Sequence, residues 1–483
     1  MKFIKEKISI SEALSATDWG VFFFLLCLTL GFVFYGEFRK RRLKKSEKFD
    51  LLDHLIMGRR LTLPLFIATL VATWYGGIFG VTQIAFNKGI YNFITQGLFW
   101  YIAYIIFALF LVERIVSYKA VTLPDLVGKM FGPKSSKVAA VLNFFNVLPI
   151  AYVISLGIFI RSFTSLELNT SMILGLVIVL SYSVWGGLRS VIFSDIIQFF
   201  IMCIAVGLVL FFSIGEFGGL GFLKEKLPEH YFSVTSDQSY FQLFVWGFIA
   251  LSTLVDPNFY QRCFAATDSK VAKKGIFLST LIWFCFDICT TFGAMYAKAV
   301  IPEALSSEAY LIYSIQVLPE GLRGFFLAGI LATILSTLDS YLFLAGTTLT
   351  YDLSNEDHHE NPFFHCIGIL FVGAISLLMA NFFSGNIKMV WKTLGSYSAG
   401  CLLFPVLLGH FSKTKFSDNA FVATCLVSAA LMSVWSAIPR SGLLSDVDSL
   451  YIGIAASFIG LYGFNYYFAR QKSDNSQSIN RHL

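Results

Sequence analysis

The sequence predicts an all-α integral membrane protein with about 13 transmembrane helices. Of its 483 residues, 56% are hydrophobic and only 14% are charged, which is more apolar surface than the core of a water-soluble fold can bury. The apolar residues form continuous runs, whereas the strands of a membrane barrel alternate over roughly ten residues. Helices are therefore the expected spanning elements, because they satisfy their own backbone hydrogen bonds in lipid.

Thirteen apolar stretches approach or exceed the roughly 20 residues that a bilayer core requires. The stretch after Trp19 is predicted to be a retained anchor helix rather than a secretory signal, because it lacks a small-residue cleavage site and a basic cluster follows it. The thirteen stretches lie near residues 19–36, 61–86, 91–112, 138–162, 171–188, 193–214, 240–256, 274–298, 322–350, 363–383, 389–410, 420–438 and 450–468.

The basic residues predict the orientation in the membrane. When successive connections are assigned alternately to the two sides, about two thirds of the 36 lysines and arginines fall on one side, including the cluster at 39–48. Basic loops face the cytoplasm, so we expect a chain of the inner or plasma membrane with its N-terminus outside and its C-terminus inside. The net charge of +6 then lies beside anionic lipid headgroups, and nucleic acid is not an expected partner.

No separate water-soluble domain and no obligatory protein partner are indicated. The eight cysteines lie in spans or on the cytoplasmic side, so we expect free thiols. One polar loop, residues 354–362, holds His358 and His359 among acidic residues. It is either a metal site or a solvated turn, and the sequence leaves both readings open.

Two spans about 180 residues apart are interrupted in the middle of their apolar run. The first interruption covers residues 72–80 and contains Gly76 and Gly77, and the second covers residues 250–257 and ends in Pro257. A broken helix frees backbone carbonyls and amides, which is tolerated only where protein or a water-filled cavity receives them. The interruptions therefore indicate a central binding site, unless the small residues serve only close helix packing.

A stripe of hydroxyl groups lies in the middle of the long span 322–350. Its members are spaced i, i+3, i+4 and i+7, so they share one face of a helix. Hydroxyl oxygens suit a hard, singly charged cation, and carbonyls freed by the first broken helix would complete a cage. The alternative is that the hydroxyls only bond back to their own helix or join helices together. The stripe consists of Thr333, Ser336, Thr337 and Ser340.

Several segments together resemble the sodium:solute symporter family, whose members share the leucine-transporter fold. The resemblance extends roughly from Met57 to Gly409. It implies an inverted five-plus-five helix repeat, at 61–214 and 215–410, with broken first and sixth core helices. An anchor helix and basic loop at 1–60 would precede this core, and two helices at 411–483 would follow it. The segments that carry the resemblance are 57–61, 185–198, 261–266, 336–340 and 395–400.

The resemblance also implies Na⁺ as the coupling ion and, residue by residue, a principal sodium site. Its ligands would be three backbone carbonyls and two hydroxyls, from Ala72, Tyr75, Thr333, Ser336 and Thr337.

Some members of the family hold a second cation nearer the cytoplasm. Two carboxylates there would bind a cation or share a proton, and the alternative for Asp195 is that it caps or anchors the start of its helix. The matching positions in this chain are Asp195, Ser336, Asp339 and Ser340.

In this fold the substrate lies between the first and sixth core helices. Trp246 and Tyr152 are candidate lids, and the third core span lacks the Arg that would hold the carboxylate of sialic acid. The implied substrate residues are Trp74, Gly76, Gly77, Phe79, Gln83, Asn92, Thr95, Gln96, Ser252, Thr253, Ser396 and Tyr397.

Asp287 lies in mid-membrane, where a carboxylate is costly unless it is paired, protonated or serves a ligand. No Lys or Arg of its own helix is close, since Lys298 lies 11 residues, or roughly 16 Å, further along the axis. We therefore predict that Asp287 faces the substrate cavity and favours a cationic or strongly hydrogen-bond-donating solute.

These features predict a sodium-coupled symporter that imports a small organic solute by alternating access in a lipid bilayer. An enzyme is not expected, because no nucleophile, base and orienting residue come together in the sequence. Two alternatives stay open. One is a proton-coupled carrier of the same fold, which Asp339 and Asp287 would serve, and the other is a non-transporting solute receptor on this scaffold.

Overall fold

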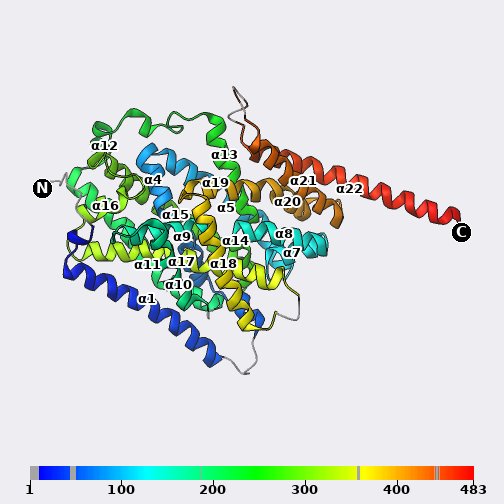
Figure 1. Ribbon diagram of the computed structural model, residues 1–483, viewed down its shortest axis with the longest axis horizontal. Helices are drawn as coiled ribbons and strands as arrows, with labels where there is room; N and C mark the ends of the chain where they lie inside the picture. The colour runs from blue at the N-terminus through cyan, green and yellow to red at the C-terminus, as the bar shows by residue number, and fades with distance from the viewer. Residues whose placement is uncertain are drawn as a thin grey trace.

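The helices of the chain pack around one central helix, α17 (Leu322–Thr347) (Figure 1). The computed structural model describes residues 10–43, 50–184, 187–355, 359–439, 441, 444 and 447–482. The described residues form helices and loops, with a single isolated β-bridge and no strand. The all-α prediction is confirmed. Glu356, Asp357 and His358 of the polar loop lie outside the described residues, as do Lys44, Lys45 and Lys48 of the basic cluster.

Eleven helices of the described chain are long and apolar enough to cross a membrane, and they match eleven of the predicted stretches. The other two predicted stretches hold shorter helices. One is α10 (Leu168–Ser183), and the other is the pair α3 (Leu63–Ala72) and α4 (Ile78–Lys88). The total of 13 therefore stays a prediction.

The remaining α-helices are α1 (Ala16–Leu43), α2 (Leu51–Ile56), α5 (Phe99–Ile106), α6 (Val112–Ser117), α7 (Leu123–Met130), α8 (Pro133–Asn146), α9 (Ile150–Arg161), α11 (Leu188–Phe217), α12 (Leu220–Lys226), α13 (Tyr240–Ala250), α14 (Pro257–Ala265), α15 (Ser269–Val300), α16 (Ala309–Val317), α18 (Pro362–Phe382), α19 (Ile387–Ser398), α20 (Phe404–Phe411), α21 (Asp418–Ala437) and α22 (Ser449–His482). Wider π-helical turns occur at Phe93–Leu98, Phe107–Leu111, Thr348–Asp352 and Ala399–Leu403. Narrow 3₁₀ turns occur at Ile10–Ala13, Met57–Arg59, Glu229–Phe232 and Leu251–Val255.

The first core helix is broken where the sequence predicts, because α3 ends at Ala72 and α4 begins at Ile78. A side chain from another helix satisfies a backbone carbonyl next to the break: the indole N–H of Trp283 donates to the carbonyl of Val71 at 3.4 Å. Gly76 is required for close packing, since a Cβ atom there would lie 2.5 Å from the Cβ atom of Thr337 on α17. The break is thus pressed against the hydroxyl stripe of α17.

The sixth core helix is broken between α13 and α14, where a 3₁₀ turn follows Ala250. Pro257 has no amide hydrogen, so it starts α14 at the position where a helix needs no donor. Asp256 caps this helix, since its Oδ1 accepts from the amides of Asn258 (2.8 Å) and Phe259 (3.3 Å). The predicted second interruption is confirmed, and its cap is a carboxylate.

A short clip joins the start of the first core helix to the end of the sixth. The amide of Leu61 donates to the carbonyl of Ala265 at 2.9 Å, and the amide of Thr267 donates back to the carbonyl of Leu61 at 3.1 Å. The guanidinium of Arg59 donates to the carbonyl of Phe264 at 3.1 Å. The two backbone bonds form the β-bridge between Leu61 and Ala266, and the Arg59 side chain adds a third link beside it.

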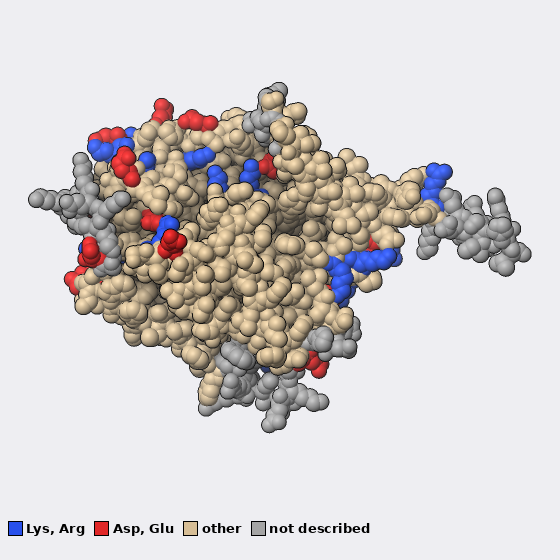
Figure 2. All heavy atoms as spheres, viewed as in Figure 1, with Lys and Arg blue, Asp and Glu red and all other residues tan. Residues whose placement is uncertain are grey.

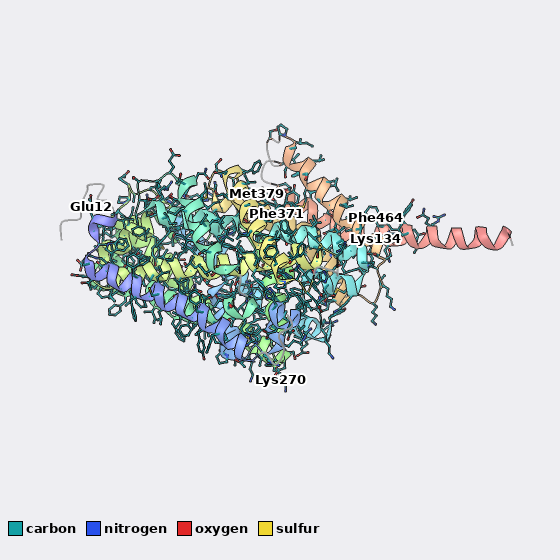
Figure 3. The ribbon with its side chains drawn as sticks, turned by 60° about the horizontal axis from the view of Figure 1, so that its bottom comes forward. Glu12, Lys134, Lys270, Phe371, Met379 and Phe464 are labelled. Atoms are coloured by element: carbon teal, nitrogen blue, oxygen red, sulfur yellow. The ribbon has the colours of Figure 1, made fainter. Side chains whose placement is uncertain are left out.

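The outer surface is mainly apolar, as expected of helices that face lipid. Figure 2 shows Lys, Arg, Asp and Glu gathered toward the ends of the molecule, with a broad face of other residues between them. In Figure 3, Lys270 and Glu12 lie at the margins, whereas Phe371 and Met379 lie over the middle on α18. Phe371 is 50% exposed, and α22 projects from the rest of the chain in Figure 1.

Candidate functional site

Four of the five predicted sodium ligands meet between the first break and α17. The hydroxyl of Ser336 lies 2.7 Å from the carbonyl oxygen of Ala72, and the hydroxyl of Thr337 lies 3.5 Å from the same oxygen. The carbonyl of Thr333 lies 2.9 Å from the Thr337 hydroxyl and 3.2 Å from the Ser336 hydroxyl. The hydroxyls of the stripe therefore contact α3 as well as the carbonyls of their own helix.

The donor set of this oxygen cage suits a sodium ion. We use the name oxygen cage for Ala72, Thr333, Ser336 and Thr337, all of which are fully buried. Carbonyl and hydroxyl oxygens carry partial negative charge, and carbonyls freed at a broken helix are common ligands of Na⁺ in transporters. No ion pair or hydrogen bond of the described residues brings a Lys or Arg to these oxygens. A cation would replace the hydrogen bonds that now join the hydroxyls to the Ala72 carbonyl.

Tyr75, the fifth predicted ligand, lies in the same break, and its side chain is fixed from α15. Its hydroxyl donates to Asp287, and its ring packs against Phe286 with centroids 4.0 Å apart. The second oxygen of Asp287 accepts from the hydroxyl of Tyr101 on α5. Asp287 thus has two phenol partners from other helices, so the structure places it against the break and outside the cavity that the sequence predicts it to face.

The predicted second cation site contains a buried guanidinium. Nη2 of Arg262 donates to the hydroxyls of Thr69 (3.2 Å), Thr73 (2.8 Å) and Ser340 (3.0 Å). The Thr69 hydroxyl in turn donates to Oδ2 of Asp195 at 2.5 Å. We call these five residues the Arg262 cluster, and Asp195 and Arg262 are fully buried in it.

Asp339 is turned away from this cluster. Its two oxygens accept from the hydroxyls of Ser183 and Tyr182 at the end of α10, the latter at 3.1 Å. The structure therefore unites Asp195 and Ser340 around Arg262, leaves Ser336 in the oxygen cage and bonds Asp339 to α10.

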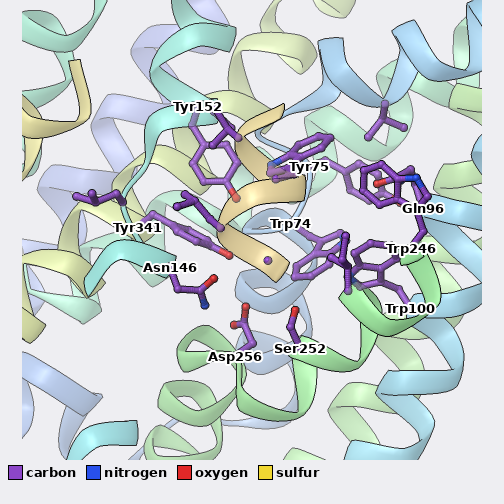
Figure 4. A pocket seen from close by; sticks show the side chains of 18 residues that line it. Trp74, Tyr75, Gln96, Trp100, Asn146, Tyr152, Trp246, Ser252, Asp256 and Tyr341 are labelled. Carbon is purple, nitrogen blue, oxygen red and sulfur yellow. The ribbon is translucent and has the colours of Figure 1, made fainter. Parts of the chain in front are cut away.

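A cavity of about 130 Å³ lies next to the two breaks (Figure 4). It has room for roughly ten water-sized groups. The π-helical turn at Phe93–Leu98 contributes Gln96, and Tyr341 comes from α17, one turn and one residue beyond Ser336. The lining residues are Trp74, Tyr75, Val81, Gln96, Trp100, Asn146, Leu148, Ala151, Tyr152, Trp246, Ile249, Ser252, Asp256, Tyr341, Val390, Trp391, Leu394 and Gly395.

Three of the predicted substrate residues line this cavity, namely Trp74, Gln96 and Ser252, and so do the candidate lids Tyr152 and Trp246. The other predicted substrate residues do not line it, and most of them contact protein elsewhere. On the first core helix, Gly76 faces Thr337 and Tyr152, Gly77 faces the Trp391 ring, Phe79 is buried, and Gln83 donates to Ser306. On the second, Asn92 donates to Thr291, and the Thr95 hydroxyl donates to the Tyr91 carbonyl. Thr253 and Ser396 are buried, and their hydroxyls have no hydrogen-bond partner among the described residues, whereas Tyr397 bonds Ser433 of α21.

Sequence reasoning missed several residues of the site. Asp256 and Pro257 were visible as the end of the second interruption, but an Asp before a Pro reads as a helix cap. Arg262 was visible only as part of a family segment. Trp100, Trp391 and Tyr341 carried no signal, because aromatic residues make up 17% of the chain.

Known proteins share sequence similarity with most of this chain. The sodium:solute symporter family matches residues 54–426. A high-affinity proline transporter from Bacillus subtilis (strain 168) is 23% identical over 370 residues, which are 71% of this chain and 76% of that protein. A sodium/pantothenate symporter from Escherichia coli (strain K12) is 23% identical, covering 71% and 75%. A sodium/glucose cotransporter from Vibrio parahaemolyticus is 23% identical, covering 86% and 84%.

Solved structures show the same fold. A Na⁺-coupled sialic acid symporter in a substrate-bound outward-open state aligns with a TM-score of 0.73 at 17% identity, over 92% of this chain and 96% of that one. A nucleobase-cation-symport-1 family transporter in a closed conformation aligns with a TM-score of 0.54 at 11% identity, over 88% and 95%. The predicted leucine-transporter-like architecture is confirmed.

The family match extends over most of the chain and includes both breaks, the oxygen cage and all of the residues that line the cavity. Since the family consists of transporters, the prediction of a membrane transporter rather than an enzyme is also confirmed. The chain belongs to the sodium:solute symporter family.

Proposed function

We propose that this protein imports a small organic solute through the cavity beside the two breaks, driven by Na⁺ bound in the oxygen cage. The observation that carries the proposal is the 2.7 Å approach of the Ser336 hydroxyl to the Ala72 carbonyl, which joins the first break to α17. The carbonyl and hydroxyl oxygens of the cage suit Na⁺, and the backbone carbonyl of Tyr75 would add the fifth oxygen. The names of the relatives, which include proline, pantothenate and glucose, support a small organic solute.

The geometry links ion binding to solute binding. Trp74 and Tyr75 lie in the first break, two and three residues after the cage residue Ala72, and both line the cavity. An ion bound to the Ala72 carbonyl would therefore hold one wall of the cavity in place. Such an ion raises solute affinity by stabilising the conformation that the solute binds.

Uptake into proteoliposomes tests this function. An inward sodium gradient is expected to drive accumulation of one solute from a panel that includes proline, pantothenate, glucose and choline, and potassium in place of sodium is expected to abolish it. Accumulation driven by a proton gradient without sodium would instead establish a proton-coupled carrier. Sodium-dependent solute binding without any accumulation would establish a receptor.

The proposed orientation places the N-terminus outside and the C-terminus in the cytoplasm of a cell with this protein in its plasma or inner membrane. It follows from the basic loops. In a cysteine-free background, Glu229→Cys is expected to react with an impermeant thiol reagent added outside intact cells, and Asn355→Cys only after the cells are opened. Both positions are exposed. The reverse labelling would invert the topology and leave sodium coupling untouched.

A further inference from the structure

The side chains of the cavity indicate the charge of the solute. Four tryptophans and three tyrosines are among the described residues that line it. Asp256 is the only acidic residue among them, and none is Lys, Arg or His. The cavity therefore combines aromatic walls with one negative charge.

The aromatic rings surround the space on more than one side. Trp74, Trp100 and Trp246 follow one another along one wall, with ring centroids 6.5 Å apart at each step. Tyr152 and Tyr341 stand on the other side, with centroids 4.9 Å apart. Figure 4 shows these two groups facing each other across the cavity. Ring faces arranged in this way attract cations, and such cages recognise quaternary ammonium groups.

Asp256 supplies the charge at the end of this space. Figure 4 shows its carboxylate and the hydroxyl of Ser252 directed into the cavity. Oδ1 is held by the two amides at the start of α14, and no ion pair joins this carboxylate to a Lys or Arg of the described residues. Arg262, further along the same helix, directs its hydrogen bonds to Thr69, Thr73 and Ser340. The carboxylate is thus available to a positively charged ligand.

We propose that the transported solute is a small organic cation, whose ammonium or methylated ammonium group lies among the aromatic rings and opposite Asp256. This inference rests on the proposed function. It moves the negative charge expected of the substrate site from Asp287, which Tyr75 and Tyr101 occupy, to Asp256. An organic anion would meet only a like charge here, and a sugar carries no charge to pair with Asp256.

Binding to the purified full-length protein tests the inference. The probes are choline, tetramethylammonium and 3,3-dimethyl-1-butanol, a neutral compound in which carbon replaces the choline nitrogen. Each is titrated in sodium buffer by calorimetry or tryptophan fluorescence. We expect choline and tetramethylammonium to bind, and the neutral alcohol to bind at least about tenfold more weakly, which corresponds to about 1.4 kcal/mol.

Asp256→Asn is the decisive variant, because Asn caps a helix about as well as Asp and removes only the charge. It is expected to weaken choline binding about tenfold or more while its thermal stabilisation by sodium stays as in the wild type. Asp268→Asn is the matched control. Asp268 caps α15 by accepting from the amide of Val271 at 2.9 Å and lies outside the cavity. Its choline affinity is expected to be unchanged.

The outcomes separate this inference from the proposed function. Equal affinity for choline and the neutral alcohol, or full choline affinity in Asp256→Asn, would overturn the assignment. So would a failure of both cations to bind to a protein that sodium does stabilise. Choline binding without any stabilisation by sodium would overturn sodium coupling and support the cationic solute.

Discussion

The oxygen cage and the Arg262 cluster share two helices, α3 and α17, but the cluster also takes Asp195 from α11 and Arg262 from α14, and the two sites differ in charge. Ser336 belongs to the cage, and Ser340, one helical turn or roughly 6 Å further along α17, belongs to the cluster. The cage offers only neutral oxygens. The cluster already holds a carboxylate, Asp195, and a guanidinium, Arg262, joined through the Thr69 hydroxyl.

This difference determines where a mobile cation is expected. Two unit positive charges 4 Å apart repel each other by about 4 kcal/mol at an effective dielectric constant of 20. A sodium ion beside Ser340 would meet that repulsion from Arg262, whereas a sodium ion beside Ser336 would meet oxygens alone. We therefore expect one sodium ion per transport cycle, bound in the cage. The guanidinium of Arg262 occupies the place where a second sodium ion would otherwise bind.

The largest effect is expected from Arg262→Gln, which removes the fixed cation of the cluster. It leaves the buried charge of Asp195 without compensation, so we expect a loss of about 3–5 kcal/mol in the free energy of unfolding. Unfolding in detergent measures it. The double variant Arg262→Gln, Asp195→Asn is expected to recover a large part of that loss. A single variant as stable as the double variant would show that the two groups are independent.

The double variant Ser336→Ala, Thr337→Val tests the cage directly. Each lost oxygen contributes about 1.5–3 kcal/mol to a charged partner, so we expect the apparent sodium affinity to fall about 100-fold or more. Sodium activation of uptake and thermal stabilisation by sodium measure it.

Its matched control is Ser376→Ala with Thr424→Val. These hydroxyls are also buried, but their hydrogen bonds within the described part of the chain go to carbonyls of their own helices, those of Val372 and Ala420. Unchanged sodium activation in the cage variant, with an unchanged control, would remove sodium from the cage.

Asp287→Asn tests whether the cage depends on the position of the first break. The variant keeps the shape but weakens the hold on Tyr75, so we expect sodium affinity and the solute KM each to worsen about threefold to tenfold, equivalent to about 1 kcal/mol. Tyr101→Phe removes the other partner of Asp287 and is expected to have the smaller effect on sodium affinity. Wild-type kinetics in Asp287→Asn would show that Tyr75 is held without it.

The smallest effect on sodium is expected from Ser340→Ala. Its hydroxyl accepts from Arg262 and serves no ion in our proposal, so the loss is one hydrogen bond of about 0.5–1.5 kcal/mol in unfolding free energy. Sodium affinity is expected to change less than threefold by the same uptake assay. A drop as large as that of the cage variant would place a sodium ion in the cluster after all.

The sequence was sufficient for features that lie within one helix. Hydropathy located the spans, Gly76 and Pro257 located the breaks, and the spacing of Ser336 and Thr337 placed their hydroxyls on one face. The resemblance to a family then supplied Ala72 as the partner across the break. The breaks and the hydroxyl stripe could be predicted because each depends on the residues of a single helix, whereas the contact with Ala72 needed the resemblance.

The lining of the cavity depends on how separate helices are rotated against each other. This rotation cannot be predicted from a single sequence. The sequence could not identify the partners of Asp287, because Tyr75 and Tyr101 reach it from the first break and from α5. Asp256 was hidden by its second role as a helix cap. The contact of Arg262 with the hydroxyl stripe could not be predicted, since its hydrogen-bond partners come from other helices than its own.

The clip between Leu61 and Ala266 has a kinetic consequence. Its two amide hydrogens, on Leu61 and Thr267, belong to segments about 200 residues apart but are held by one pair of reciprocal bonds. Both become exposed to solvent in the same opening event, so their protection against hydrogen–deuterium exchange is expected to match and to respond together to sodium. Exchange at these two amides therefore shows whether the two broken helices separate during the transport cycle or move together.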